Sequence, residues 1–188
     1  MTRRLVARLF ASVDGVVSAP NTFQFDSFDD ELARIVGDSL RGVDNVILGR
    51  VMYEQWAAYW TGAGADDPFA DFINPVAKHV ASRTLAPSDL TWSNSHLIQG
   101  DLEQFVRELK RTDGGIIAIE GSTSVVRQLF LAGLVDTLTL IVHPVIAGNG
   151  ERLFGDDVPI TRLELVAHEI TSKGNAVLAY ALKAGASG

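Results

Sequence analysis

Short apolar runs alternate along the chain with segments whose apolar residues follow helical spacing. The apolar runs predict strands over residues 5–12, 43–48, 78–82, 116–119 and 135–142. Two further runs, 163–170 and 176–182, flank Lys173-Gly174-Asn175 and predict a terminal hairpin. Strands that alternate with helices favour an α/β fold with a mixed, mostly parallel sheet and a C-terminal antiparallel hairpin. No repeat or linker interrupts the pattern, which favours a single domain over residues 1–188.

Polar residues mark where the helices should begin and end. The clearest helix follows Asp101, whose spacing to Gln104 matches a capping box. Ser27 is the predicted N-cap of a helix over residues 28–40. Residues 52–60 have helical spacing, and residues 61–68 predict a loop. Residues 122–124 predict the cap of a helix that ends at Gly133.

Composition narrows the class of protein. Of the 188 residues, 47% are hydrophobic and 21% are charged, as in an ordinary globular chain. The chain has no cysteine, which excludes disulfide scaffolds, thiolate metal sites and cysteine nucleophiles. The net charge of −7 argues against a nucleic-acid binder. No apolar run reaches the roughly 18 residues of a membrane span, so we expect a cytoplasmic protein with no membrane partner.

The histidines do not form a recognisable metal set, so we expect no metal site. His168-Glu169 lacks the second histidine that a helical zinc motif places four residues after the first. His143 precedes Pro144, which blocks further strand pairing, and this favours a role in a turn.

Three predicted strands end in the same kind of junction. The carboxyl ends of parallel strands meet at one edge of a sheet, where ligands bind. Glycine lets a backbone approach a phosphate, helix starts attract anions, and arginine forks match phosphate oxygens. We therefore expect a site for a multiply phosphorylated ligand such as a dinucleotide. Its residues are Gly49, Arg50, Ser82, Arg83, Thr84, Gly121, Ser122 and Thr123.

The kind of dinucleotide site follows from what the sequence lacks. Gly148-Asn149-Gly150 has no third glycine and no capped helix after it, so it is not a Rossmann fingerprint, and no Walker motif is present. Cations at the strand ends, in place of an acidic residue, favour a 2′-phosphate and hence NADP over NAD.

Three features allow more than one interpretation. Asp14 follows the first strand beside Gly15, where it could contact a substrate or form an Asp-Gly turn, and the residues alone favour the turn. Ser122 resembles a nucleophile, but helix capping is favoured. The aromatic segment 53–60 fits a packed core or a dimer face, and alternatively the wall of a pocket for a flat heteroaromatic substrate.

Short motifs follow one another in a definite order over residues 5–182. They are Ser12-Val13-Asp14-Gly15, Leu48-Gly49-Arg50 with Tyr53-Glu54, Lys78 with Ser82-Arg83-Thr84-Leu85, Gly121-Ser122, Gly133-Leu134-Val135-Asp136, Pro144-Val145-Ile146-Ala147-Gly148-Asn149-Gly150 and Leu153-Phe154. Their order and spacing resemble the dihydrofolate reductase-like superfamily. Within it, they are similar to the C-terminal reductase domain of bacterial riboflavin biosynthesis deaminase–reductases and its stand-alone relatives.

The resemblance implies an NADPH-dependent oxidoreductase, often a homodimer, that acts on a small molecule. The implied reaction transfers hydride to a small heterocyclic, pterin- or aminopyrimidine-like substrate, as in 5-amino-6-(5-phosphoribosylamino)uracil reductase. It also implies that Ala11 and Ser12 meet the nicotinamide and that Asp14 is the catalytic acid on the substrate side. The junction residues named above fall where the family holds the phosphates and adenosine of the cofactor.

Some residues depart from the family pattern. Met52 stands where the family has a threonine, Thr137 replaces an acid, and Gly121-Ser122 replaces a glycine pair. Asp29, Asp30 and Glu31 lie in the region of the pterin-binding acid of dihydrofolate reductases, but the motif assigns none of them to it, which argues against folate reduction. Met52 favours a second hypothesis, a non-catalytic nucleotide- or flavin-binding module on the same fold. A third hypothesis is an interaction protein that uses segment 53–60 as a dimer face.

Overall fold

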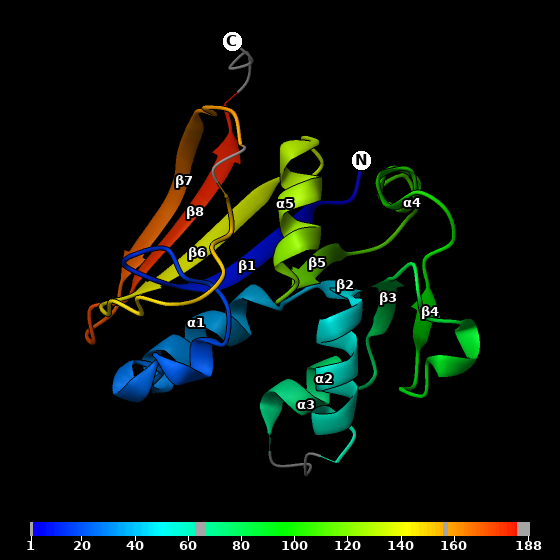
Figure 1. Cartoon of the computed structure of the whole chain (residues 1–188), viewed down its shortest axis with the longest axis horizontal. Coiled ribbons are helices and arrows are strands. Elements are labelled where there is room, and N and C mark those ends of the chain that lie inside the picture. The colour runs from blue at the N-terminus through cyan, green and yellow to red at the C-terminus, as the bar shows by residue number, and fades with distance from the viewer. Residues whose placement is uncertain (1, 63–66, 156–157, 184–188) are drawn as a thin grey trace.

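An eight-stranded sheet runs through the computed structural model of the chain, which describes residues 2–62, 67–155 and 158–183 (Figure 1). The strand order is β4-β3-β2-β5-β1-β6-β8-β7. Strands β1 to β6 pair in parallel, whereas β8 pairs antiparallel with both β6 and β7. The predicted fold class is therefore confirmed. The strands are β1 (Leu5–Ser12), β2 (Val43–Gly49), β3 (Ala77–Ala81), β4 (Ser95–Leu97), β5 (Ile116–Glu120), β6 (Thr137–His143), β7 (Leu163–Ile170) and β8 (Ala176–Leu182).

Helices cover both faces of the sheet (Figure 1). Residues of α4 and α5 pack with Leu5, Ala7 and Leu9 of β1, and residues of α2 and α3 pack with Val46 and Leu48 of β2. Alternate side chains of each strand point to opposite faces, which gives the sheet two separate apolar layers. The helices are α1 (Asp30–Ser39), α2 (Arg50–Trp60), α3 (Pro68–Ile73), α4 (Leu102–Leu109) and α5 (Thr123–Leu131).

The helix ends differ in part from the prediction. Asp101 caps α4 by accepting the Gln104 N–H at 2.9 Å, and Gly133 follows α5 with a φ of +69°. Pro68 begins α3, so the predicted loop is shorter, and its residues 63–66 lie outside the described residues. Ser27 as the N-cap of α1 is wrong, because the carboxylate of Asp29 accepts the Leu32 N–H at 3.0 Å.

Ser27 instead belongs to a buried polar cluster around His143. The His143 Nδ1 lies 2.7 Å from the Ser27 Oγ, and the Ser27 hydroxyl donates to the Gln24 carbonyl at 2.5 Å. The hydroxyl proton is thus used, so Nδ1 must carry the imidazole proton. His143 ends β6 with no exposed surface, and burial lowers its pKa. His143 does lie at a turn, because the Val145 N–H donates to its carbonyl at 2.8 Å. Its side chain in addition holds segment 24–27 against the sheet.

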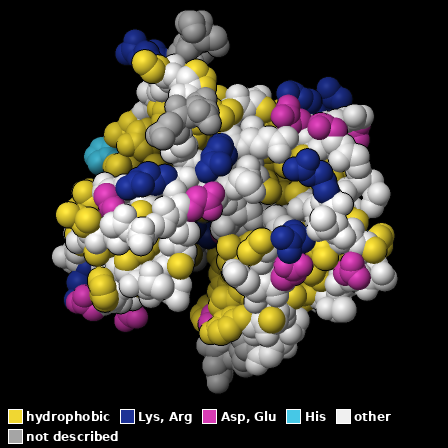
Figure 2. All heavy atoms as spheres, viewed as in Figure 1, with side chains coloured by type: hydrophobic (Ala, Val, Ile, Leu, Met, Phe, Trp, Pro, Cys, Tyr) yellow, Lys and Arg dark blue, Asp and Glu magenta, His cyan; other side chains and the backbone are white. Residues whose placement is uncertain are grey.

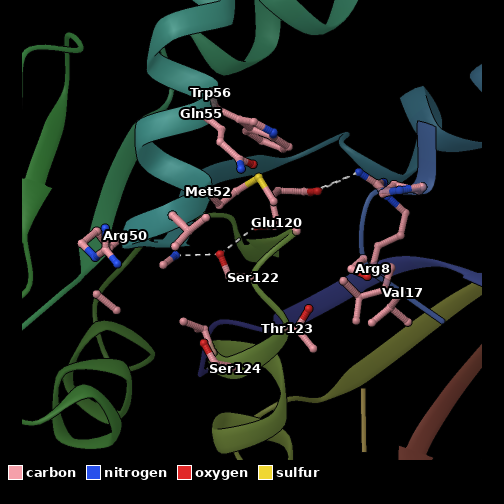
Figure 3. A pocket seen from close by; sticks show the side chains of 18 of the residues that line it. Arg8, Val17, Arg50, Met52, Gln55, Trp56, Glu120, Ser122, Thr123 and Ser124 are labelled. Atoms are coloured by element: carbon pink, nitrogen blue, oxygen red, sulfur yellow. Dashed lines mark hydrogen bonds and ion pairs between the residues drawn. The ribbon is translucent and has the colours of Figure 1, made fainter. Parts of the chain in front are cut away.

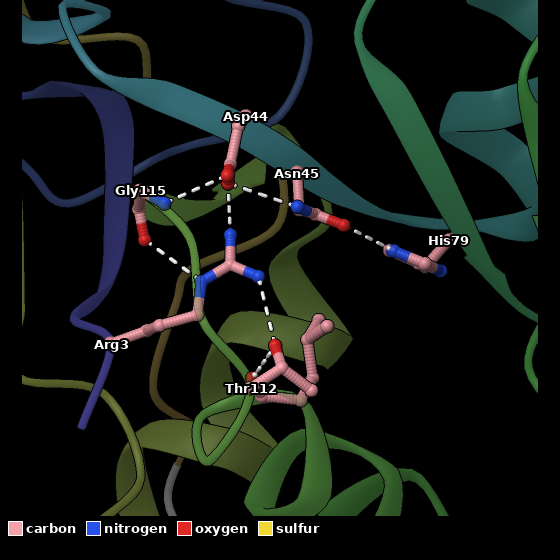
Figure 4. Close-up of polar contacts among 7 residues, drawn as sticks. Arg3, Asp44, Asn45, His79, Thr112 and Gly115 are labelled. Atoms are coloured by element: carbon pink, nitrogen blue, oxygen red, sulfur yellow. Dashed lines mark hydrogen bonds and ion pairs between the residues drawn. The ribbon is translucent and has the colours of Figure 1, made fainter.

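A second polar cluster ties the amino ends of the strands together (Figure 4). Arg3 pairs with Asp44 and donates to the Gly115 carbonyl at 2.9 Å. Asp44 accepts the Gly115 N–H at 2.7 Å and the Asn45 amide at 2.9 Å. The Asn45 carbonyl oxygen lies 2.7 Å from the His79 Nε2. These contacts fasten the end of the sheet that lies opposite the carboxyl ends of the strands.

Candidate functional site

A cleft of about 1550 Å³ opens where β2, β3 and β5 end. The predicted junctions after these three strands all line it, as parallel pairing requires. Its volume exceeds the roughly 300–1,000 Å³ of a pocket for one small ligand, so two ligands could fit side by side. The predicted residues that line the cleft are Gly49, Arg50, Ser82, Arg83, Thr84, Gly121, Ser122 and Thr123.

Two helices begin at this cleft without a side-chain cap. Gly49 stands at the N-cap of α2 and has no side chain to cap it. Ser122 stands at the N-cap of α5, and its hydroxyl does not bond to the first turn. The first N–H groups of a helix have no acceptor within the helix. The two first turns therefore offer backbone donors and two positive dipole ends to an anion.

The Ser122 hydroxyl fixes the distance between these two helix starts (Figure 3). It accepts the Gly49 N–H at 2.6 Å and donates to the Glu120 carbonyl at 3.3 Å. Ser122 therefore occupies the predicted N-cap position, but its side chain makes no bond to the first turn of α5. Ser82 also acts on the backbone, because its Oγ accepts the N–H groups of Thr84 and Leu85 at 3.1 and 3.0 Å.

Arg50 and Arg83 differ in whether their guanidinium groups are already paired with a carboxylate. Arg50 pairs with Glu54 at 2.9 Å on the surface of α2, and both side chains are more than 40% exposed. Such a pair is weak and opens readily for a stronger anion. Arg83 is exposed and forms no ion pair with any described residue. Both guanidinium groups can thus turn toward a bound phosphate; we call this part of the cleft the cation side.

A buried ion pair that sequence reasoning missed lines the other part of the cleft. Arg8 Nη2 lies 3.1 Å from both carboxylate oxygens of Glu120, which is only 6% exposed (Figure 3). Burial raises the pKa of Glu120, and the Arg8 charge opposes that rise. Arg8 also donates to the Val36 carbonyl at 3.3 Å and contacts Ser39 at the end of α1. We call this part of the cleft the acid side.

The signal for this pair was present in the sequence. Arg8 interrupts the first apolar run, and Glu120 ends another. The two residues lie directly opposite each other in the β1–β5 register. Knowing that these strands are neighbours would have turned two isolated charges into a pair.

Aromatic side chains and Met52 complete the walls of the cleft. Trp56 and Trp60 line it and pack on Phe69, with ring centroids 5.3 and 4.9 Å apart, whereas Tyr53 is buried beneath them. Segment 53–60 therefore contributes to both the packed core and the cleft wall, whereas Tyr59 is 63% exposed. Its role as a dimer face stays a prediction. A Cβ placed on Gly121 would lie 2.5 Å from the Met52 Cε, so the thioether side chain covers that glycine.

The remaining predicted residues are not part of this cleft. Ala11, Ser12 and Asp14 are described, and none of them is among the residues that line it. Ala11 is 4% exposed and Ser12 2% exposed. Both are enclosed because β1 lies in the middle of the sheet, between β5 and β6. Their contact with a nicotinamide stays a prediction.

Asp14 anchors a distant loop. Its carboxylate accepts the Ser12 hydroxyl at 2.6 Å and the N–H groups of Ala147 and Gly148 at 2.9 Å each. These bonds, that of Ser12 foremost and then that of Ala147, lower the pKa of Asp14 to about 2. Such a group holds its proton poorly. The contacts agree with the turn alternative, but they do not test the catalytic role that the resemblance implies.

Comparison with known proteins places the fold in a family. Residues 3–177 match the family described as RibD C-terminal domain. The chain belongs to the RibD C-terminal domain family. Membership confirms the predicted resemblance and indicates a reductase-like oxidoreductase. Of the residues described, no three histidines or carboxylates gather as a metal site, and no helix is long and apolar enough to cross a membrane.

Relatives of this RibD-type chain match it along nearly its whole length. YyaP of Bacillus subtilis is 26% identical over 95% of this chain and 94% of its own length. A putative riboflavin biosynthesis protein from Shewanella sp. PV-4 superposes with a TM-score of 0.71 at 16% identity, over 97% of this chain and 99% of its own. The Thermotoga maritima deaminase/5-amino-6-(5-phosphoribosylamino)uracil reductase superposes with a TM-score of 0.65 at 13% identity, over 97% of this chain but 57% of its own. At these identities the two structures show the shared fold.

Proposed function

We propose that this chain is an NADPH-dependent reductase of a small heterocyclic, pterin- or aminopyrimidine-like substrate. The observation that carries the proposal is the division of one cleft into a cation side and an acid side. Figure 3 shows Arg50 and Arg8 on opposite sides of the cleft, with the start of α5 between them. A phosphorylated cofactor suits the cation side, and a substrate that receives a proton suits the acid side. Hydride transfer requires the two ligands to lie next to each other. The location of the protein in the cytoplasm stays a prediction.

The cation side fits the phosphates of a dinucleotide. The uncapped first turns of α2 and α5 supply backbone donors, and Arg50 and Arg83 supply guanidinium forks. NADPH, when bound, supplies the hydride. Arg83 is the better partner for a 2′-phosphate, because it has no ion pair to break among the described residues.

The acid side fits a flat polar substrate. Trp56 and Phe28 line the cleft with aromatic surface, and Glu120 places a buried carboxyl group on the same wall. Burial raises the pKa of Glu120 and the Arg8 charge opposes that rise, so the ion-paired carboxylate takes up a proton, and can pass it on, more readily than an exposed glutamate. Arg8 holds the carboxyl group in position through both oxygens. We therefore assign proton delivery to Glu120.

The cofactor part of the proposal is tested by calorimetry on the wild type and Arg83→Ala. We expect the wild type to bind NADPH more tightly than NADH. Loss of one charge-assisted contact costs about 1.5–3 kcal/mol, so Arg83→Ala should weaken NADPH about 10- to 150-fold and NADH little. Arg107→Ala is the matched control, because Arg107 is an exposed arginine on α4 that does not line the cleft. Equal losses for both cofactors would remove Arg83 from the 2′-phosphate site.

The catalytic part is tested with Glu120→Gln and Glu54→Gln, two glutamates that pair with arginines of the cleft. With pterins and aminopyrimidines as acceptors, we expect Glu120→Gln to keep NADPH affinity and to lower turnover by about 10²–10⁴-fold. Glu54→Gln should leave turnover near that of the wild type. The alternative function, a non-catalytic nucleotide- or flavin-binding module, has one observation in its favour, the Met52 side chain over Gly121. It predicts tight binding of NADPH or a flavin mononucleotide without any NADPH oxidation.

A further inference from the structure

The acid side of the cleft has walls that suit an uncharged ring. Helix α1 lines it with Ala33, Val36 and Gly37, and its C-cap Leu40 continues the same helix face. Figure 2 shows the surface hollowed between α1 and α2, with hydrophobic side chains on both sides of the hollow. Trp56 of α2 adds an aromatic wall. A ligand that enters here exchanges water for apolar surface, which disfavours a charged group such as a phosphate.

Gly37 leaves room for a ligand beside α1. A glycine inside a helix is destabilising relative to alanine and usually has a packing reason. A Cβ placed on Gly37 would meet no atom within 4 Å, so packing within the chain does not require this glycine. Gly37 is exposed and lies one turn after Ala33 on the wall of the cleft. The free space over Gly37 therefore lies where a flat ring would approach the helix.

The buried polar group of the acid side is a carboxylate with acceptor positions left. The Arg8 Nη2 lies 3.1 Å from both oxygens of Glu120, which uses one position on each oxygen. A carboxylate has about four acceptor positions, so about two remain. Glu120 lines the cleft, and these positions suit the N–H donors of a ring amide or an amino group. They repel a phosphate, which brings negative charge and further acceptors.

Arg8 is not available to an anion, because its guanidinium group is already bonded. Its Nη2 pairs with Glu120, and its Nη1 donates to the Val36 carbonyl at 3.3 Å and contacts Ser39. The Arg8 side chain is only 11% exposed. The charge of Arg8 is therefore neutralised by Glu120 before any ligand arrives.

The other cations of the chain are assigned to the cofactor or lie outside the cleft. All 16 lysines and arginines are among the described residues, and those that line the cleft are Arg8, Arg50 and Arg83. The proposed function assigns Arg50 and Arg83 to the phosphates of the cofactor. Arg34 of α1 does not line the cleft and pairs with Asp38 at 3.1 Å. A phosphate on the substrate would therefore face Glu120 without a free cation beside it.

We propose that the acid side takes an uncharged, unphosphorylated ring that presents N–H donors, and that Glu120 sets this preference. The proposal rests on the proposed function, because it concerns the substrate of the same cleft. It separates this chain from the Thermotoga maritima reductase, whose name describes a phosphoribosylamino compound as its substrate.

The test is calorimetric titration with two compounds that differ by one phosphate, 5-amino-6-(5-phosphoribosylamino)uracil and 5-amino-6-ribosylaminouracil. Saturating NADP+ is present, so that the cation side is filled. We expect the wild type to bind the unphosphorylated compound at least about 10-fold more tightly. Glu120→Gln leaves the Arg8 charge without a carboxylate, so it should tighten binding of the phosphorylated compound and abolish the preference. The matched control Glu54→Gln removes the partner of Arg50 on the cation side and should keep the preference.

An added charge keeps the test decisive if Glu120→Gln does not fold. Ala33 is exposed on the α1 wall, so Ala33→Lys places an ammonium group at the acid side without burying it. Ala33→Lys should tighten binding of the phosphorylated compound about 5-fold, whereas Ala33→Met, of similar length but uncharged, should not.

Three results would overturn the proposal: equal or tighter binding of the phosphorylated compound by the wild type, no binding of either compound, or a preference that neither Glu120→Gln nor Ala33→Lys alters. The titration of NADP+ itself is a separate measurement, and a cofactor that does not bind counts against the proposed function. Ala33→Lys and Ala33→Met are also compared without NADP+, so the acid side is tested in either case.

Discussion

Replacing Arg8 by methionine should leave Glu120 as a buried carboxyl group without its partner. Both oxygens of Glu120 lie 3.1 Å from the Arg8 Nη2, and Glu120 is 6% exposed. Removing one partner of a buried pair costs about 3–5 kcal/mol, because the remaining charge has neither water nor a counter-ion. Loss of the Arg8 bond to the Val36 carbonyl adds about 1 kcal/mol that does not depend on pH.

The pH dependence identifies the cause of this loss. Burial already raises the pKa of Glu120 in the wild type, and Arg8 opposes the rise. Without Arg8 the folded-state pKa must rise further. A carboxyl group whose folded pKa lies above its unfolded pKa lowers stability as the pH rises through the folded value. The penalty of Arg8→Met should therefore be largest near pH 8 and much smaller near pH 5.

The assay is urea unfolding at both pH values, followed by circular dichroism. Arg50→Met is the matched control, because Arg50 pairs with Glu54 on the surface of the same cleft, and it should cost no more than about 1 kcal/mol at either pH. The double variant Arg8→Met/Glu120→Gln should recover most of the loss at pH 8. A penalty that is equal at pH 5 and pH 8, with no recovery in the double variant, would refute the buried-charge reasoning.

Three further variants, one of them with a matched control, test other parts of the structure. Asp14→Asn should lower the melting temperature but not turnover. The difference in melting temperature from the wild type should shrink as the pH falls from 3.8 toward 2, because the Asp14 carboxylate is then protonated. A fall in turnover of about 100-fold or more would instead identify Asp14 as the catalytic acid. Lys78→Met should lower the unfolding free energy by about 2–4 kcal/mol in a urea titration, because the Lys78 ammonium donates to three backbone carbonyls at 2.8–2.9 Å. The control Lys173→Met should change it little. Equal losses in the two variants would show that these three hydrogen bonds do not stabilise the fold. Burial, followed by the charges of His96 and Arg3, lowers the pKa of His79 to about 4. Wild-type stability should therefore fall as the pH drops from 6.5 to 4, and His79→Phe should flatten that slope; an unchanged slope would contradict this reasoning.

The elements that the sequence predicted are those with local causes. The apolar runs became strands because a buried strand needs apolar residues over a short stretch. The three junctions after the predicted strands could be expected to meet, since parallel strands end at one edge of the sheet. By contrast, β4 is only three residues long and α3 only six, too short for a periodic signal.

What could not be predicted depends on contacts between distant parts of the chain. The Arg8–Glu120 pair needs the β1–β5 register, which joins residues 112 positions apart. The Asp14 carboxylate is occupied by N–H groups 133 and 134 positions away, so its local Asp-Gly pattern could not exclude a free acid. Ser27 stands where a local pattern predicts an N-cap. Its actual partner, His143, is 116 residues away, so the sequence did not reveal that contact.

Amide hydrogen exchange in the presence of NADPH tests the central claim most directly. The claim is that the uncapped first turns of α2 and α5 hold the cofactor phosphates at the cation side of the cleft. NADPH should slow exchange at Arg50, Val51, Thr123 and Ser124, NADH should do so less at equal concentration, and the hairpin strands β7 and β8 should not respond. Protection elsewhere in the chain, or none at a concentration that saturates binding, would contradict the account.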